Sequence, residues 1–427
     1  MKGRRIYILF LCVFVWVAGA RADGPFRAHR YDSFRGLAVD STNIVFMGNS
    51  ITDMHDWAEA FANPHILNRG VSGALSCEVL ANLDPVIAGR PAKFFLMIGT
   101  NDLGSDTLPQ QVADNVRKIV QRFRRESPRT ELYIQSILPS TVGKRTLELE
   151  QETNNLLKEI AQQEGVRYID LWDALSGICT DEQLSLDGLH LTAAGYKVWC
   201  DSIAPYVGGG SVYPSNTTTL QQSAGLWGSF GMRATYGSVL PLNVGDELFF
   251  GDEMVKCGEW RELTGNLQLK NRGTGWGYDG TANSVAITRS MVTATFANAG
   301  DCTGKLRRIV LYTGTGDVNG TTSLDTIFEQ YRALVNDIRT HAPTTPIAIV
   351  SLMPTIEKSK RVKRFNLLLK RWCETTTNLS YIDIYSPLSK NGKPNRKYYQ
   401  GNYLMGQGYR VVADKVTDAC AERREHE

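Results

Sequence analysis

The stretch NIVFMGNSIT, residues 43–52, decides the fold. Within its first five residues, 44–47 form a short apolar run, which is typical of a buried parallel strand, and Ile51–Phe61 has the character of a helix. Ser50 lies at the turn between the two. In parallel sheets, reactive groups gather beyond the carboxyl ends of the strands. We therefore expect a strand–turn–helix unit that presents the Ser50 hydroxyl at a sheet edge.

Short apolar runs alternate with longer amphipathic runs on both sides of this unit. This alternation predicts a parallel α/β sheet with helices on both faces. Thr192 is the expected N-cap of the last helix, which runs toward Ala204. The expected strands are Asn43–Met47, His65–Leu67, Lys93–Ile98, Leu132–Leu138 and Val166–Leu171, and the expected helices between them include Leu108–Arg125 and Leu147–Glu164.

The chain contains a second copy of this pattern. Because several matches occur in the same order, they indicate a duplicated domain rather than a short-period repeat. The matching stretches are 48–57 with 251–260, 68–70 with 271–273, 98–102 with 313–317, 168–170 with 381–383, and 195–198 with 408–411.

A chain of 427 residues also favours two domains. We expect a signal peptide over residues 1–22, a first domain over 23–207, a linker over 208–236 and a second domain over 237–427. The glycine-rich segment 208–211 and the polar segment that follows mark the linker.

The first residues predict export. A basic start (Lys2, Arg4, Arg5) precedes the apolar run Ile6–Val17 and a small-residue cleavage site that ends at Ala22. The apolar run is short for a membrane span, so we expect a secreted or periplasmic protein with no stable span. An uncleaved membrane anchor is the alternative.

Composition limits the partners and cofactors. The formal charge of +3 falls to about −1 without the signal segment, and no long basic run remains, so nucleic-acid binding is not expected. Seven cysteines would remain; Cys179 and Cys200 could pair, but sequence leaves this open. We expect no metal and no cofactor.

The residues of a nucleophilic serine site follow the predicted strands. A serine hydroxyl needs a base within hydrogen-bond reach, and His190 in the segment Asp187–His190 can serve, with Asp187 orienting its ring. The Ser50 N–H, the Gly73 N–H and the Asn101 side chain are three donors that could hold an oxyanion. Taken singly, each of these motifs is more typical of a turn or loop; their order and placement favour catalysis.

The blocks Gly48–Thr52, Gly73, Gly99–Asp102 and Asp187–His190 together resemble those of the SGNH (GDSL-type) hydrolase superfamily. The nearest branch is that of platelet-activating-factor acetylhydrolase-like enzymes and sugar O-acetylesterases. The resemblance covers about residues 42–207 and implies a flavodoxin-like α/β/α sandwich. It also implies Ser50 as nucleophile, His190 and Asp187 as its partners, and Ser50, Gly73 and Asn101 as the oxyanion hole. The commoner first block has aspartate where this chain has Asn49.

The second copy lacks these groups. Glu253 stands in the place of Ser50, Gly316 in that of Asn101, Tyr403 in that of His190 and Gln400 in that of Asp187. We expect a degenerate domain without hydrolase activity. It is a candidate for glycan binding through aromatic residues near the former site, although packing is the alternative role for them. These residues are Trp276, Tyr278, Tyr398 and Tyr399.

The sequence thus predicts a secreted serine esterase whose active site lies in the first half. Its expected substrate is an O-acetylated sugar or glycan, or a small ester. A phospholipid or short-chain lipid ester is the alternative substrate, and a non-catalytic glycan-binding protein is the alternative function.

Overall fold

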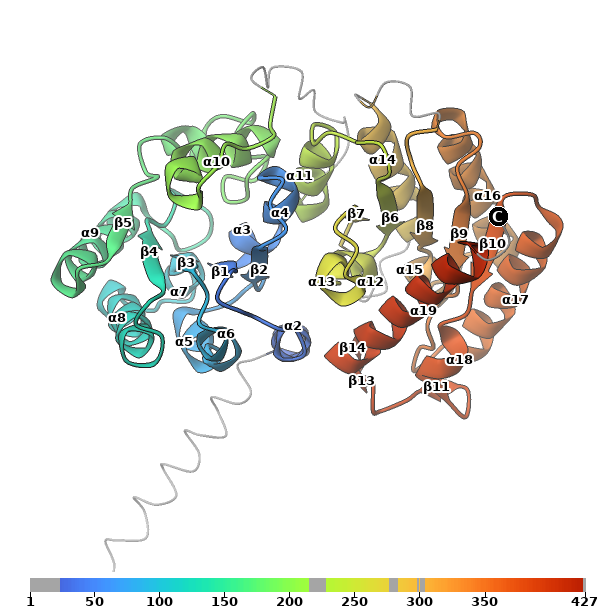
Figure 1. Cartoon of the computed structure of the whole chain (residues 1–427), viewed down its shortest axis with the longest axis horizontal. Helices are drawn as coiled ribbons and strands as arrows, with labels where there is room; N and C mark the ends of the chain where they lie inside the picture. The colour runs from blue at the N-terminus through green and yellow to red at the C-terminus, as the bar shows by residue number, and fades with distance from the viewer. Residues whose placement is uncertain (1–23, 215–227, 276–282, 298, 300–303, 425–427) are drawn as a thin grey trace, which may run out of the picture.

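The computed structural model describes residues 24–214, 228–275, 283–297, 299 and 304–424 (Figure 1). The expected signal peptide lies outside the described residues. Two parallel sheets of five strands each have the order β2-β1-β3-β4-β5 and β7-β6-β8-β9-β10. The second order repeats the first, strand for strand, so the predicted duplicated α/β fold is confirmed.

The first sheet and its helices follow the predicted alternation. The strands are β1 (Ile44–Gly48), β2 (Ile66–Gly70), β3 (Lys93–Met97), β4 (Glu131–Gln135) and β5 (Arg167–Ile169). The helices are α2 (Pro25–Arg35), α3 (Ser50–Asp53), α4 (Trp57–Ala60), α5 (Ser76–Ala81), α6 (Asp84–Gly89), α7 (Thr100–Gly104), α8 (Pro109–Glu126), α9 (Leu147–Glu164), the short 3-10 helix η1 (Ser176–Cys179) and α10 (Ala193–Val207).

The second sheet repeats this arrangement. Its strands are β6 (Glu247–Gly251), β7 (Leu269–Gly273), β8 (Arg308–Tyr312), β9 (Ile347–Val350) and β10 (Leu379–Ile382). Its helices are α11 (Gly228–Gly237), α12 (Glu253–Lys256), α13 (Trp260–Thr264), α14 (Ser284–Phe296), α15 (Thr315–Asn319), α16 (Leu324–His341), α17 (Ser359–Thr375), α18 (Tyr385–Leu388) and α19 (Gly406–Arg424). Two small hairpins precede α19: β11 (Ser389–Lys390) with β12 (Lys393–Pro394), and β13 (Tyr399–Gln400) with β14 (Tyr403–Leu404).

Each face of the first sheet is covered by helices. Alternate residues of β1 point to opposite faces: Val45 and Met47 pack in the core that α8 and α9 cover, while Ile44 and Phe46 pack in the core that α10 covers. All five residues of β1 are buried. Burial on both faces explains why the strand is an unbroken apolar run rather than an alternating one.

The helix expected over Ile51–Phe61 is wrong in detail, because two one-turn helices, α3 and α4, replace it. The side-chain amide of Asn68 on β2 donates to the carbonyls of Thr52, Asp53 and His55, at 2.9–3.3 Å. Those carbonyls are therefore diverted from a continuing helix. The Asp56 carboxylate then caps α4 by accepting from the Glu59 N–H. A neighbouring strand has overridden local helical preference.

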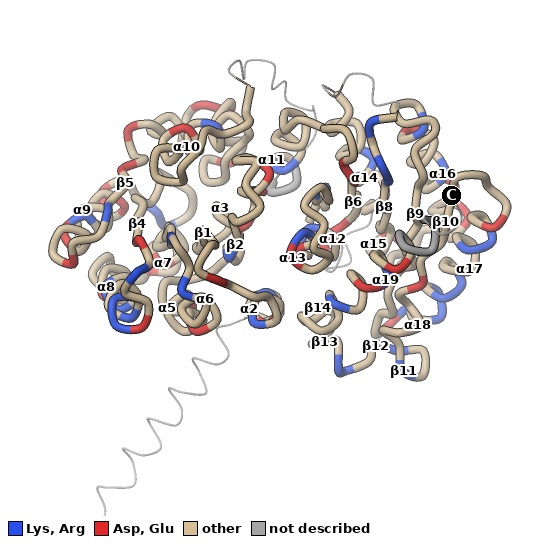
Figure 2. The backbone as a smooth tube through the Cα atoms, viewed as in Figure 1, with Lys and Arg blue, Asp and Glu red and all other residues tan. Residues whose placement is uncertain are grey.

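The segment expected as a linker, 208–236, contains most of the helix α11, which packs beside α10 and α14. The helix α2, which precedes the first strand, has no counterpart among the expected elements. Cys179 and Cys200 are both free thiols. Within the described part of the chain, no helix is long and apolar enough to cross a membrane. Basic and acidic residues are interspersed over both halves (Figure 2).

Candidate active site

Ser50 lies where β1 ends and α3 begins. The Asn49 side chain caps this helix by accepting from the Ile51 N–H at 3.0 Å, so asparagine performs the capping that an aspartate could perform. The Tyr196 hydroxyl on α10 donates to the Ile51 carbonyl at 2.7 Å. These two hydrogen bonds hold the turn from two sides, and Ser50 is only 7% exposed.

The residues 185–192 bring His190 to this serine. The Ser50 Oγ lies 2.8 Å from the His190 Nε2, and the His190 Nδ1 lies 2.8 Å from the Asp187 Oδ2. An isolated bridge between Ser185 and Leu191 closes the loop, and Thr192 caps α10 as expected. The structure thus joins Ser50 to an imidazole and a carboxylate from a segment 140 residues away, through two successive hydrogen bonds.

Asp187 is built to remain ionised. Its Oδ1 accepts from the backbone N–H groups of Leu189 and His190 at 3.0 and 2.7 Å. Partial burial raises the pKa of the Asp187 carboxyl, but the hydrogen bonds from His190 and from these backbone groups outweigh burial and leave the pKa below its usual value. A charged carboxylate on Nδ1 leaves Nε2 facing the serine as the acceptor.

Besides the Ser50 N–H, which follows β1, the expected oxyanion donors come from the segments that follow β2 and β3, the two strands beside β1. Gly73 follows β2 and has a φ of +82°, which a side chain would strain. Asn101 lies in α7, after β3, and its Nδ2 donates to the Ala74 carbonyl at 3.1 Å. Among the described residues, the N–H groups of Ser50 and Gly73 are assigned no acceptor. Donors from three neighbouring strand ends therefore share one edge of the sheet.

Sequence reasoning missed Arg145, which orients Asn101. The Arg145 Nη2 donates to the Asn101 Oδ1 at 3.2 Å, and its Nε donates to the Thr100 carbonyl at 3.0 Å. The guanidinium fixes which end of the amide faces Ala74 and polarises its N–H groups. Arg145 lies in the polar segment 139–146, which reads as an ordinary loop, so no sequence signal separates it from surface arginines.

Sequence reasoning also missed Ser140 and Glu150, two buried residues that hold the loop 185–192, which carries His190. The Ser140 Oγ donates to the Gly188 carbonyl at 2.9 Å, and the Ser140 N–H donates to the Glu150 Oε2 at 2.7 Å. Glu150 is fully buried and its other carboxyl oxygen has no partner among the described residues. Burial raises the pKa of Glu150 to about 8, although the Ser140 N–H and the Arg145 charge oppose the rise. Glu150 lies at helical spacing with the buried residues Leu157 and Ile160, so the periodicity of α9 is a signal that could have placed it on the buried face.

In the second half, the equivalent site has a different composition. Glu253 begins α12 as Ser50 begins α3, and the Asp252 side chain caps α12 as Asn49 caps α3. Tyr403, in the place of His190, stacks on the ring of His29 from α2, with centroids 4.9 Å apart. Of the aromatics expected near a glycan, Tyr399 is buried and Tyr398 is half-buried, while Trp276 and Tyr278 lie outside the described residues. Burial of Tyr399 favours the packing role for that residue.

Comparison with known proteins gives a family for both halves. The model of the GDSL-like lipase/acylhydrolase family matches residues 46–198 and 250–411. Human platelet-activating factor acetylhydrolase IB subunit alpha2 is 27% identical over 172 residues, which are 37% of this chain and 72% of the relative. Subunit alpha1 from Pongo abelii is 29% identical, over 38% of this chain and 73% of the relative. The solved acetylxylan esterase Axe2 from Geobacillus stearothermophilus is 16% identical, with a TM-score of 0.35, over 40% of this chain and 95% of that one.

Proposed function

Since the chain belongs to the GDSL-like lipase/acylhydrolase family and is a carboxylic ester hydrolase, we propose that it removes O-acetyl or other short acyl groups from a sugar or glycan. The Ser50–His190–Asp187 chain, with its two contacts of 2.8 Å, carries this proposal. It is the geometry that a hydroxyl needs to become a nucleophile.

The reaction follows from the positions of the groups. The Ser50 oxygen attacks the ester carbonyl carbon while its proton passes to the His190 Nε2. The negative charge that develops on the carbonyl oxygen is held by the N–H groups of Ser50 and Gly73 and by the Asn101 amide. Collapse breaks the ester bond, and the leaving alcohol takes the proton from His190. Water, deprotonated by His190, then attacks the acyl-Ser50 ester, and the acid leaves as Ser50 regains its proton.

Two observations support a short acyl group and a polar substrate. The mammalian relatives are named acetylhydrolases, so acetyl is the acyl group that the likeness favours. The groups of the site are polar or charged: Ser50 contacts His190, His190 contacts Asp187, and Arg145 donates to Asn101. A phospholipid ester is the second candidate substrate, because the relatives are named for platelet-activating factor.

We also propose that the protein acts outside the cytoplasm, in a secreted or periplasmic form. The basic start, apolar run and small-residue site within residues 1–22 support this. N-terminal sequencing of the exported protein should begin at Asp23. An unprocessed N-terminus on a membrane-bound protein would support the anchor instead.

Hydrolysis assays test the activity and its substrate. Wild-type protein should turn over p-nitrophenyl acetate, and Ser50→Ala and His190→Ala should not, whereas Ser41→Ala, at an exposed serine, should match wild type. Acetate release should then be compared across acetylated sialic acids, acetylated xylan, peptidoglycan fragments and platelet-activating factor. Acetate release from platelet-activating factor alone would show that the substrate is a phospholipid and not a sugar. No turnover of any ester by wild type would favour a binding protein.

A further inference from the structure

The two halves meet through side chains that the duplication relates to one another. Arg69 on β2 donates to both carboxyl oxygens of Glu262, at 2.9 and 2.7 Å. Its counterpart Arg272 on β7 donates to both oxygens of Glu59, at 2.9 and 2.7 Å, and Glu59 is the counterpart of Glu262. Reciprocal contacts of this kind define a twofold, isologous interface, here within one chain.

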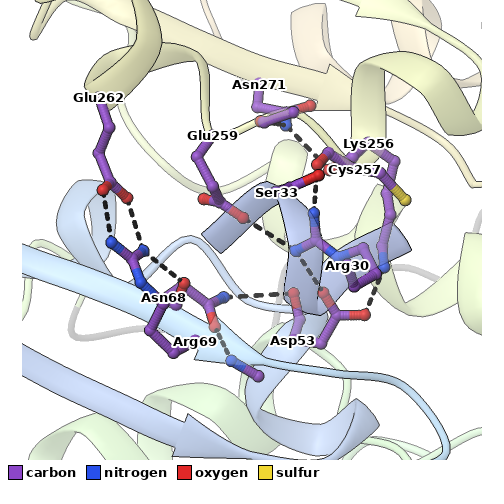
Figure 3. A network of polar contacts seen from close by, with 12 residues as sticks. Arg30, Ser33, Asp53, Asn68, Arg69, Lys256, Cys257, Glu259, Glu262 and Asn271 are labelled. Atoms are coloured by element: carbon purple, nitrogen blue, oxygen red, sulfur yellow. Dashed lines mark hydrogen bonds and ion pairs between the residues drawn. The ribbon is translucent and has the colours of Figure 1, made fainter. Parts of the chain in front are cut away.

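Asp53 and Lys256 lie where this approximate twofold relation maps a position onto itself. They are 203 residues apart, the spacing that relates the two copies, and they form an ion pair with each other. In a symmetric dimer the same position would bring two identical charges together. A tandem chain can place opposite charges there, and Figure 3 shows the resulting network between the halves.

The carboxylate of Asp53 ties together two parts of the active site. Asp53 is the last residue of the one-turn helix α3, whose first residue is Ser50. Its Oδ2 accepts from the Ser72 Oγ at 2.5 Å, and Ser72 directly precedes Gly73. Burial raises the pKa of Asp53, but the charges of Lys256 and Arg30 outweigh burial and lower the pKa to about 2. The carboxylate is therefore held charged between cations and the two loops.

The helix α2 provides the second cation and is itself docked on the C-terminal half. Arg30 lies 3.4 Å from Asp53, donates to Glu259 at 2.9 Å and also donates to the Cys257 carbonyl. The Gly406 N–H donates to the Asp32 Oδ2 at 2.8 Å. The ring of Tyr403, in the place of the lost histidine, packs on α2. The degenerate site thus holds the helix that in turn contacts Asp53.

We propose that the C-terminal half is a positioning domain for the active site in the N-terminal half: Lys256, with Arg30 of the docked α2, holds Asp53 and so fixes the turn that carries Ser50 and the loop that carries Gly73. This inference rests on the proposed function. Lys256 is a positioning residue, because its ion pair is with Asp53 and it acts on Ser50 and Gly73 through that carboxylate. A positioning role explains why the C-terminal half, which has no triad, retains an extensive, charged interface with the N-terminal half.

The test compares two lysines that cross the same interface. Lys256 and Lys270 have side chains that are 8% and 6% exposed, but Lys270 pairs with Glu59 on α4, at 3.0 Å, and not with α3. Both Lys256→Met and Lys270→Met should lower Tm. Only Lys256→Met should lower kcat, by about 10-fold or more, since small misplacements near a reacting centre can cost on the order of 100-fold. KM should stay within about twofold.

Two further readouts separate positioning from general destabilisation. The rate at which a fluorophosphonate inactivates the enzyme, measured well below each Tm, should fall with kcat in Lys256→Met. Lys256→Arg, which keeps the charge, should recover most of both rates. Should Lys256→Met not fold, Lys256→Gln against Lys270→Gln gives the same comparison.

Equal kcat values for the Lys256 and Lys270 variants would overturn the inference and leave the proposed function intact. Wild-type protein that neither hydrolyses p-nitrophenyl acetate nor reacts with the fluorophosphonate would instead overturn the proposed function.

Discussion

Arg145 shows how one side chain can decide the quality of an oxyanion hole. Its guanidinium donates to the carbonyl oxygen of the Asn101 amide. The amide nitrogen of Asn101 then donates one N–H to the Ala74 carbonyl and has a second N–H for the expected oxyanion. An amide that rotates freely would lose orientation, and orientation is what makes such donors effective.

Substitution at these two residues should therefore lower turnover to different extents. Asn101→Ala should lower kcat on the order of 100- to 1000-fold, because it removes a donor. Arg145→Met should lower kcat by about 10-fold with little change in KM, since the donor remains but is no longer held. Lys144→Met, which removes the exposed partner of Asp106, is the control and should match wild type in steady-state assays. Equal kcat for Arg145→Met and Lys144→Met would refute the role of Arg145.

Glu150 should make stability depend on pH. Its pKa is about 8 in the folded protein, above the ordinary value of 4.5, so the folded state holds a proton that the unfolded state has released. The stability that this proton confers is complete below about pH 4.5 and is lost progressively as pH rises to about 8.

Glu150→Gln mimics the protonated carboxyl at every pH, so the variant should not lose stability as pH rises toward 8. Its Tm should exceed that of wild type by roughly 2–4 °C at pH 8, and the difference should vanish near pH 4.5. Glu152→Gln, at an exposed position of the same helix, is the control and should leave the pH dependence of Tm unchanged. A lower Tm for Glu150→Gln at pH 8 would show that the charged form is the stable one.

The candidate site was predictable to the extent that it follows strand ends. Ser50, Gly73, Asn101 and the segment 187–190 were identified because each belongs to a short motif beside a predicted strand or helix cap. Arg145 and Glu150 contact residues that are distant in sequence. The spacing of Glu150 from Leu157 indicates that it faces the core, but neither residue belongs to a motif that identifies its partner.

The turn of α3 depends on how closely β2 approaches it. A Cβ added at Gly70 would lie 2.3 Å from the Asp53 N and 2.7 Å from the Thr52 carbonyl carbon, both rigid backbone atoms. The helix that carries Ser50 therefore packs on a strand end that admits only glycine.

Gly70→Ala should displace α3 and lower both stability and kcat, with a cost of about 1–3 kcal/mol or more from overpacking. Gly36→Ala is the matched control, since Gly36 has an ordinary φ of −86° and an added Cβ would lie 3.7 Å from the Ser33 carbonyl oxygen, an ordinary van der Waals contact. Denaturant unfolding and p-nitrophenyl acetate turnover should separate the two variants. Wild-type behaviour of Gly70→Ala would contradict this packing.

The order of strands and long helices was predictable because it depends on apolar periodicity. The expected helix Leu147–Glu164 has the observed bounds. The break between α3 and α4 was not predictable, since the Asn68 amide that diverts three carbonyls comes from the next strand. The helix α2 escaped prediction because its burial depends on both halves, including its stacking on Tyr403.

Buried ion pairs join the two halves of the molecule. The side chain of Glu59 is 2% exposed and contacts Arg272, Lys270 and Arg261. Burial raises the pKa of Glu59, but the Arg272 charge and its hydrogen bonds, with help from Lys270 and Arg261, outweigh burial and hold the pKa well below the usual range. The stability that the ionised form contributes is present above about pH 4.5 and is lost as pH falls below that value.

Glu59→Gln should therefore destabilise the protein at pH 7 by about 3–5 kcal/mol, because it leaves buried cations without their anion. The difference from wild type should narrow as pH is lowered from 4.5 toward 2, as urea unfolding would show. Glu329→Gln, in an exposed pair with Arg332, should unfold like wild type at every pH. If the difference in unfolding free energy between Glu59→Gln and wild type did not change with pH, Glu59 would not be ionised in the folded protein.

We propose that each chain holds a single acyl-transfer site, built around Ser50, and that the second copy holds none. The most direct measurement is titration of the folded protein with a fluorophosphonate, followed by mass spectrometry of the intact chain and of its peptides. We expect one adduct per chain, on the peptide that contains Ser50, with much slower labelling after His190→Ala. Two adducts per chain, or an adduct within residues 237–427 on a protein that hydrolyses esters, would contradict it.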